Sequence, residues 1–134
     1  MLDSTAAVAA ERQGKNARQL LETVALEAGD EGIAVSVVTV LELAHGITRA
    51  NTTERRDRRQ RFLDDLLTGV PVQPVTVPIA LHAGQIDGQS QAKGVRIPLS
   101  DLLIGPCALE LGYGVGTANV RHFQTIPGLR VVRL

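Results

Sequence analysis

The stretch I33-A-V-S-V-V-T-V-L-E-L-A-H-G46 changes its pattern halfway along, and this change decides the fold class. Its first part, Ile33 to Val38, is short, apolar and rich in β-branched residues, which is typical of a strand buried on both faces. From Thr39 to about Gly46 the pattern becomes helical. A buried strand that passes directly into a helix predicts an α/β protein with a largely parallel sheet.

The rest of the chain repeats this alternation of strand and helix. The patterns predict helices over residues 15–28, 53–68, 78–94 and 100–111, and further strands over residues 72–77, 114–117 and 129–133. Gly29 and Asp30 end the first of these helices, and Gly69 and Pro71 end the second. With the short segment before Asp3, we expect four or five strands in a single domain over residues 1–134.

Composition excludes several classes of protein. The 14 basic and 14 acidic side chains balance, which argues against binding nucleic acid through bulk positive charge. With no Trp, two Phe and one Tyr, the chain offers little for stacking exposed bases. The single Cys107 forms no internal disulfide, and no signal peptide or membrane-spanning run is visible, so we expect a cytoplasmic protein with no membrane partner.

Four polar residues fall where a predicted strand gives way to a helix or loop: Asp3, Glu42, Asp101 and Asn119. Ligand sites in parallel sheets lie at the carboxyl ends of the strands, so these side chains converge if the strands are neighbours. Three carboxylates close together repel each other, and a divalent cation relieves that repulsion. All-oxygen ligation favours Mg²⁺, with Mn²⁺ as a substitute, and such ions support hydrolysis of phosphodiesters.

Each position also has a purely structural explanation. Thr39 and Glu42 match a capping box, and an acid at position 101 suits the start of a helix because of the helix dipole. Asn119 is also typical of a turn or a cap. No obvious cap or turn requires Asp3, although a frayed terminus would leave it in water.

The four blocks that carry these residues resemble one known family. They are D3-S-T5, S36-V-V-T-V-L-E-L-A-H-G-I47, I97-P-L-S-D-L-L-I104 and T117-A-N-V-R-H-F-Q-T-I-P-G-L-R-V-V132. In this order and spacing they are similar to PIN domains, and most similar to bacterial VapC-type toxins. The resemblance implies a three-layer α/β/α domain with a four- to five-stranded, mainly parallel sheet.

The resemblance also implies a function and partners. It implies a Mg²⁺-dependent endoribonuclease, the toxin of a type II toxin–antitoxin pair, which inhibits translation by cutting structured RNA such as tRNA or rRNA. Asp3, Glu42 and Asp101 match the metal-binding acids, and Asn119 stands at the fourth catalytic position. A VapB-like antitoxin would hold the enzyme inactive through a helix in an apolar groove and a basic side chain near the acids. DNA would be bound only through the antitoxin, and the toxin would form a homodimer.

Departures from the family pattern give further expectations. Asn119 contributes no charge, which favours one firmly held metal ion over two. Pro106 is expected to kink or delay the helix that carries Asp101. Only Met1 and Leu2 precede Asp3, so an upstream start stays open. If residues are missing there, a strand this short is expected to hold Asp3 weakly.

Two other signals have alternative explanations. Glu11 either orients a water on the metal or is a solvated helix end. The arginines of the 53–68 helix either grip an RNA backbone or pair with acids one turn away; they are Arg55, Arg56, Arg58, Arg59 and Arg61. Two other functions also stay open: a catalytically weakened module that acts through antitoxin and operator assembly, and a metal-dependent DNA nuclease.

Overall fold

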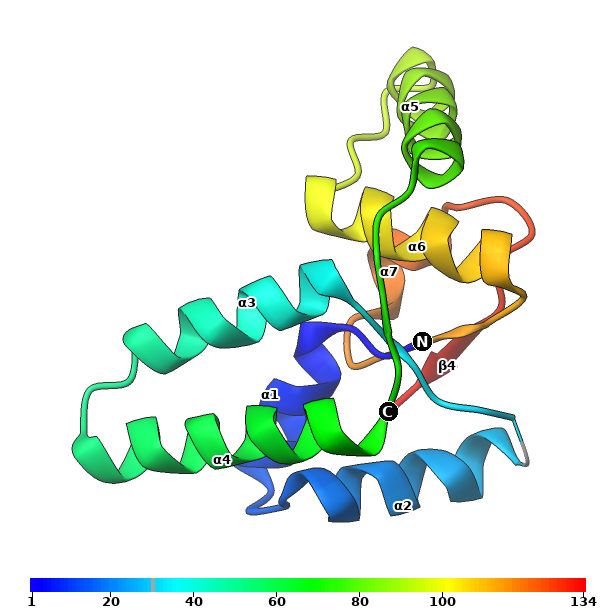
Figure 1. Ribbon diagram of the computed structural model, residues 1–134. Coiled ribbons are helices and arrows are strands. Elements are labelled where there is room, and N and C mark those ends of the chain that lie inside the picture. The colour runs from blue at the N-terminus through cyan, green and yellow to red at the C-terminus, as the bar shows by residue number, and fades with distance from the viewer. Residues whose placement is uncertain (30) are drawn as a thin grey trace.

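The structure is a computed structural model that describes residues 1–29 and 31–134 (Figure 1). Asp30, which the sequence places at a helix end, lies outside the described residues. The elements in chain order are α1 (Ser4–Arg12), α2 (Ala17–Ala28), β1 (Val35–Ser36), α3 (Val37–Thr48), α4 (Thr53–Gly69), β2 (Val72–Gln73), α5 (Val77–Ala92), α6 (Leu99–Leu111), β3 (Val115–Thr117), α7 (Val120–Phe123) and β4 (Val131–Arg133).

The strands form two parallel pairs that Leu2 joins. β1 pairs with β2, and β3 pairs with β4, both in parallel. Leu2 forms parallel bridges to Val35 on one side and to Gly116 on the other. The spatial order is therefore β2, β1, Leu2, β3, β4, which confirms the predicted parallel sheet of an α/β fold.

The segment before Asp3 is held firmly in the centre of this sheet. The amide of Leu2 donates to Ala34 O at 2.9 Å, and the amide of Asp3 donates to Gly116 O at 3.2 Å. Leu2 is also buried, with 2% of its surface exposed. The expectation that so short a strand holds Asp3 weakly is wrong, because neighbouring strands satisfy the backbone on both sides.

Two apolar clusters join the strands to the helices. Figure 1 shows α5 and α6 apart from α2 and α4. Met1 belongs to the cluster that also contains residues of α5, α6 and α7, among them Ile86, Ile104 and Phe123. Leu2 belongs to the other cluster, which contains residues of α1, α2 and α4. Since successive residues of a strand point to opposite faces, Met1 and Leu2 anchor the two helical layers on either side of the sheet.

Strand and helix boundaries differ from the predictions mainly at β-branched residues. Val37 and Val38 begin α3 rather than ending a strand, and Val77 begins α5. The cause at α3 is the Ser36 hydroxyl, which accepts a hydrogen bond from the amide of Val38 at 3.1 Å and so caps the helix. The prediction that helix begins at Thr39 was therefore late by two residues.

Two details of the helices concern their buried side and their boundaries. In α4, Leu63 and Leu66 are buried, whereas 39% of the surface of Leu67 is exposed. Pro106 lies inside α6, which begins at Leu99, so the proline does not delay that helix. No helix in residues 1–29 and 31–134 is long and apolar enough to span a membrane.

Candidate active site

Three predicted site acids are brought to the same edge of the sheet by different elements. Asp3 is the N-cap of α1, Glu42 lies in α3 just after β1, and Asp101 lies in the first turn of α6. Burial raises the pKa of each carboxyl group. Repulsion by the charge of Asp101 adds to this rise in the pKa of Asp3 and of Glu42. The charge of Asp101 therefore disfavours the ionised forms of the other two carboxyl groups.

Asp3 is the most tightly held of the three. It is 3% exposed, and its Oδ1 accepts hydrogen bonds from Thr5 Oγ1 at 2.7 Å and from the amide of Ala6 at 3.2 Å. Its Oδ2 accepts from Thr117 Oγ1 at 2.6 Å. The bond from Ala6 caps α1, so the expectation that no cap requires Asp3 is wrong. Its burial likewise rules out the frayed, solvated terminus.

The two threonine hydroxyls are themselves fixed by backbone amides. Thr5 Oγ1 accepts from the amide of Ala118 at 3.0 Å, and Thr117 Oγ1 accepts from the amide of Asn119 at 2.9 Å. A hydroxyl has one hydrogen to donate. The two hydroxyls also lie 2.9 Å from each other, but each is closer to an oxygen of Asp3, at 2.7 Å for Thr5 and 2.6 Å for Thr117. The sequence patterns identified neither Thr5 nor Thr117 as a residue of the site. Thr117 left a signal, because it is a polar residue at the end of a fully buried strand.

Glu42 is held by α1 rather than by its own helix. Ser4 Oγ donates to Glu42 Oε1 at 3.2 Å. The capping-box explanation is wrong, because Thr39 lies inside α3, is 1% exposed and donates its hydroxyl hydrogen to Leu2 O at 3.1 Å. With that explanation removed, Glu42 stands as an inward-facing acid of the site.

Asp101 is held by a histidine that the sequence analysis did not include. His122 Nδ1 lies 2.8 Å from Asp101 Oδ2, and the two side chains are 34% and 14% exposed. Burial raises the pKa of Asp101, and the hydrogen bond and charge of His122 oppose that rise. Asp101 also occupies the first helical turn, so its favourable position in the helix dipole is compatible with a role in the site.

Asn119 is exposed and occupies the N-cap position of α7. Its side chain makes no capping hydrogen bond, so the explanation of Asn119 as a side-chain cap is wrong. Its backbone is linked to Asp3 through Thr117. The catalytic role of its side chain stays a prediction.

The carboxylate oxygens of the three acids suit a hard cation whose coordination is completed by water. Across residues 1–29 and 31–134, no group of three or more His, Cys, Asp or Glu side chains is arranged so that it could hold a metal ion by itself. A carboxylate offers about four lone pairs, and each of the three acids has lone pairs left after its hydrogen bonds within the protein. Mg²⁺ is usually bound through one or two carboxylates and several waters, which suits such an open arrangement.

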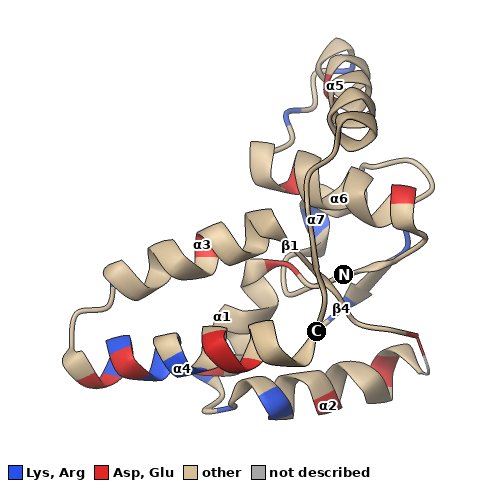
Figure 2. Ribbon diagram, in the orientation of Figure 1, with Lys and Arg blue, Asp and Glu red and all other residues tan. Residues whose placement is uncertain are grey.

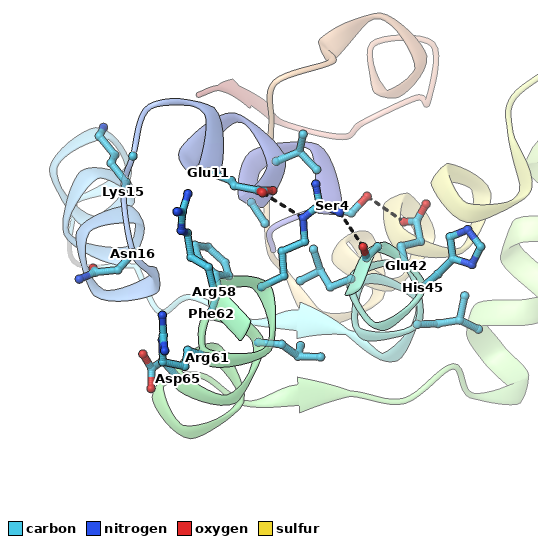
Figure 3. Close-up of a pocket in the computed structure, with 18 residues that line it drawn as sticks. Ser4, Glu11, Lys15, Asn16, Glu42, His45, Arg58, Arg61, Phe62 and Asp65 are labelled. Carbon is cyan, nitrogen blue, oxygen red and sulfur yellow. Dashed lines mark hydrogen bonds and ion pairs between the residues drawn. The ribbon is translucent and has the colours of Figure 1, made fainter. Parts of the chain in front are cut away.

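A groove of about 620 Å³ begins at Glu42, the one of the three acids that lines it among the described residues, and runs between α1, α3 and α4 (Figure 3). Ser4 and Glu42 line one end of it, and Lys15, Arg58 and Arg61 lie towards the other. Apolar side chains such as Val8, Leu41 and Phe62 line its walls.

Glu11 and Arg59 form an ion pair within this groove. Arg59 Nε lies 2.9 Å from Glu11 Oε1, and a guanidinium NH of Arg59 also donates to Gly46 O at 2.6 Å. Glu11 is therefore not a solvated helix end.

Acidic and basic residues alternate along α4 (Figure 2), but the described part of the chain contains no ion pair within that helix. The pairing of its arginines with acids one turn away is therefore not seen among the described residues, and their contact with an RNA backbone stays a prediction.

Comparison with known proteins identifies the family. A family model described as PIN domain matches residues 1–127. The chain is 35% identical over 101 residues to Ribonuclease VapC10 of Mycobacterium tuberculosis, over 75% of this chain and 70% of that protein. It is 28% identical over 99 residues to the tRNA(fMet)-specific endonuclease VapC of Salmonella typhimurium, over 74% of this chain and 73% of that protein.

A solved structure supports the same fold. VapBC2 from Rickettsia felis, bound to a DNA fragment from its promoter, superposes with a TM-score of 0.84 at 23% identity, over 100% of this chain and 97% of that chain. The predicted three-layer fold and the resemblance carried by the four sequence blocks are both confirmed. The chain belongs to the PIN-domain family and, within it, to the VapC proteins.

Proposed function

We propose that this protein is a metal-dependent endoribonuclease that acts as the toxin of a toxin–antitoxin pair and inhibits translation by cutting RNA. The observation that carries the proposal is the set of three acids at one sheet edge, each held by a donor from another element. Thr117 holds Asp3, Ser4 holds Glu42 and His122 holds Asp101. The names of the relatives, which include a tRNA(fMet)-specific endonuclease, support RNA as the substrate.

The proposed roles follow from how each residue is held. Asp3 and Asp101 would bind Mg²⁺, or Mn²⁺ in its place, and Glu42 would bind it directly or through a water. The exposed side-chain amide of Asn119 would orient the outer coordination shell of the metal ion. When bound, the ion supplies Lewis acidity towards a phosphodiester and lowers the pKa of water. The hydrogen bonds to the acids keep their oxygens in place, which lowers the cost of reorganisation during the reaction.

The direct test is cleavage of labelled RNA, such as total tRNA and rRNA, with Mg²⁺ and with EDTA. We expect cleavage that depends on the metal and that is far weaker on single-stranded DNA of the same sequence. Cleavage that persists in EDTA would contradict the metal mechanism, and preferential cleavage of DNA would favour a DNA nuclease. Absence of all cleavage, with antitoxin binding retained, would favour a catalytically weakened module.

The groove beside the acids supports a VapB-like antitoxin as a partner. Leu41 and Val8 line it and are 67% and 40% exposed, which is a large apolar surface for a free protein. An amphipathic helix fits such a groove, and a basic side chain on it would meet the acid end near Glu42. Acidic side chains on the same helix would meet the opposite end near Arg58 and Arg61.

This partner is tested with the product of a small antitoxin-like reading frame, which we expect directly upstream of the gene. Leu41→Asp should weaken binding by at least about tenfold, because it places a charge on apolar surface that the complex buries. Leu26→Asp is the matched control, since Leu26 is 88% exposed on α2 and does not line the groove. Equal affinities for both variants would place the antitoxin elsewhere.

The exposed face of α5 supports a homodimer. Val77 and Leu81 are one turn apart and are 72% and 71% exposed. Asp87 is the only Lys, Arg, Asp or Glu residue in this helix, so α5 is largely without charge (Figure 2). We propose that a second copy covers this face. Light scattering should show a dimer that Leu81→Asp converts to a monomer, and an unchanged mass would contradict this interface.

A further inference from the structure

Asp101 differs from the other two acids in what holds it. Asp3 accepts hydrogen bonds from two hydroxyls and one amide, whereas the carboxylate of Asp101 has a single donor among residues 1–29 and 31–134, which is His122. This bond joins α6 to α7 across 21 residues of sequence. The rotation of the Asp101 carboxylate therefore depends on one imidazole.

The direction of this hydrogen bond follows from the chemistry of the pair. An ionised carboxylate only accepts hydrogen bonds, so His122 Nδ1 carries the hydrogen and Asp101 Oδ2 accepts it. Asp101 Oδ1 has no partner in the described residues and remains available to a ligand. The imidazole thus holds Oδ2 and leaves Oδ1 as the oxygen of Asp101 that is free to bind a ligand.

The backbone that carries His122 is rigidly placed. Its helical neighbours Val120 and Phe123 are buried, with Phe123 fully inaccessible to solvent. Thr125 Oγ1 donates to His122 O at 2.7 Å, which ties the end of the same helix. The ring itself is one-third exposed, so its removal does not open the core.

We infer that His122 is a positioning residue of the metal site, which fixes Asp101 Oδ2 through Nδ1 and so directs Asp101 Oδ1 towards Mg²⁺. This inference rests on the proposed metal-dependent function. Groups that hydrogen-bond to metal ligands commonly change metal affinity by about 10- to 100-fold when they are removed. His122 acts through Asp101 and not on the substrate.

The test is calorimetric titration of the metal-free protein with Mg²⁺. We expect His122→Leu to weaken binding by about 10- to 100-fold, since it fills similar space without a donor. His122→Asn should restore affinity to within about threefold of wild type, because its amide nitrogen occupies the position of Nδ1. In an Asp101→Asn background, His122→Leu should have no further effect on the weakened binding.

His82→Leu provides the matched control. His82 Nδ1 also lies near a carboxylate, at 3.1 Å from Glu110 Oε1, but this pair joins α5 to α6 and includes none of the three site acids. The control should bind Mg²⁺ as wild type does. Thermal unfolding in EDTA, compared among all the variants, reports any general loss of stability separately.

The outcomes separate this inference from the proposed function. If wild type binds no Mg²⁺, the metal-dependent function fails and this inference fails with it. If wild type binds and His122→Leu binds equally well, only the positioning role is overturned. Should His122→Leu unfold, His122→Ser takes its place, because serine is too short to reach Asp101 and should weaken Mg²⁺ binding in the same way. If both unfold in EDTA, His122 is a structural residue and the inference is overturned.

Discussion

Thr117 Oγ1 donates a hydrogen bond of 2.6 Å to Asp3 Oδ2, and so joins two residues 114 positions apart in the sequence. The bond links the end of β3 to the start of α1. Asp3 directly follows Leu2, and Thr117 directly follows Gly116, the two residues that form a parallel bridge. A site acid near the beginning of the chain is therefore held by a residue close to its end, and the site exists only when the central sheet is formed.

Thr117→Val should destabilise the protein and weaken the site. Valine keeps the shape of threonine but removes the donor, and this leaves one oxygen of the buried Asp3 without its partner, at a cost of about 1–3 kcal/mol. Urea unfolding in EDTA measures this cost. Thr68→Val is the control, because Thr68 is exposed on α4 and its change should cost less than about 0.5 kcal/mol. Equal losses in both variants would contradict a special role for the bond.

Glu42→Gln should have opposite effects without and with metal. Burial and the charges of Asp101 and Asp3 raise the pKa of Glu42 above its ordinary value of 4.5. A carboxyl group whose pKa is raised by folding loses stabilising free energy as the pH rises through that raised value. The glutamine keeps an oxygen for Ser4 but has no charge. In EDTA at pH 7 the variant should therefore unfold at a higher temperature than wild type.

The pH dependence and the metal dependence both check this prediction. The advantage of Glu42→Gln in EDTA should shrink as the pH falls below 4.5, where the carboxyl group is protonated in both folded and unfolded chains. Saturating Mg²⁺ should reverse the order, since wild type then gains a ligand charge that the variant lacks. A variant that is less stable than wild type in EDTA at pH 7 would show that the ionised Glu42 does not destabilise the folded protein.

The fold was largely predictable, because its signals are local. Strand β1 followed at once by α3 is visible in the switch from a β-branched run to a helical pattern. The predicted start of this helix at Thr39 was wrong because Val37 and Val38, as β-branched residues, favour a strand. The hydroxyl of Ser36 caps the helix, so that α3 begins at Val37. Local propensity therefore gives the order of elements, and a single capping bond decides where each begins.

Glu11→Gln should weaken the fold slightly and leave Mg²⁺ affinity unchanged. The ion pair of Glu11 with Arg59 ties α1 to α4, and both side chains are about one-quarter exposed at 23% and 28%. Its loss should cost about 0.5–1 kcal/mol, as for other accessible pairs. Glu22→Gln, which breaks the exposed pair with Arg18, is the control and should cost less. A large loss of Mg²⁺ affinity in Glu11→Gln would instead make Glu11 part of the metal site.

Asn119→Asp should change the metal stoichiometry. Wild type should bind one Mg²⁺ or Mn²⁺ per chain in calorimetry, because Asn119 adds no fourth charge to the three acids. The aspartate would supply that charge at an exposed position and should allow a second Mn²⁺ to bind. Asn119→Ala should lower cleavage less than Asp101→Ala does. Two ions bound by wild type would contradict this expectation.

The candidate site was predictable in its acids but not in the residues that hold them. Asp3 directly follows the bridged Leu2 and Glu42 lies in the helix after β1, so a rule about strand ends finds them. Asp101 lies in the first turn of α6, which follows α5 rather than a strand, and the resemblance of its sequence block to the family is what marks it. Thr5, Thr117 and His122 hold these acids through contacts that depend on which strands are neighbours, and spacing along the chain does not show that order. The capping box at Thr39 was misleading for the same reason, since Thr39 bonds to the central Leu2.

We propose that Asp3, Glu42 and Asp101 together form a metal-dependent ribonuclease site. The most direct measurement is the rate of cleavage of labelled RNA against Mg²⁺ concentration, for wild type and Asp101→Ala in parallel. We expect a saturable, Mg²⁺-dependent rate for wild type and a rate at least about 100-fold lower for Asp101→Ala at every Mg²⁺ concentration, with the variant still folded. Equal rates for the two proteins, or a wild-type rate independent of Mg²⁺, would contradict it.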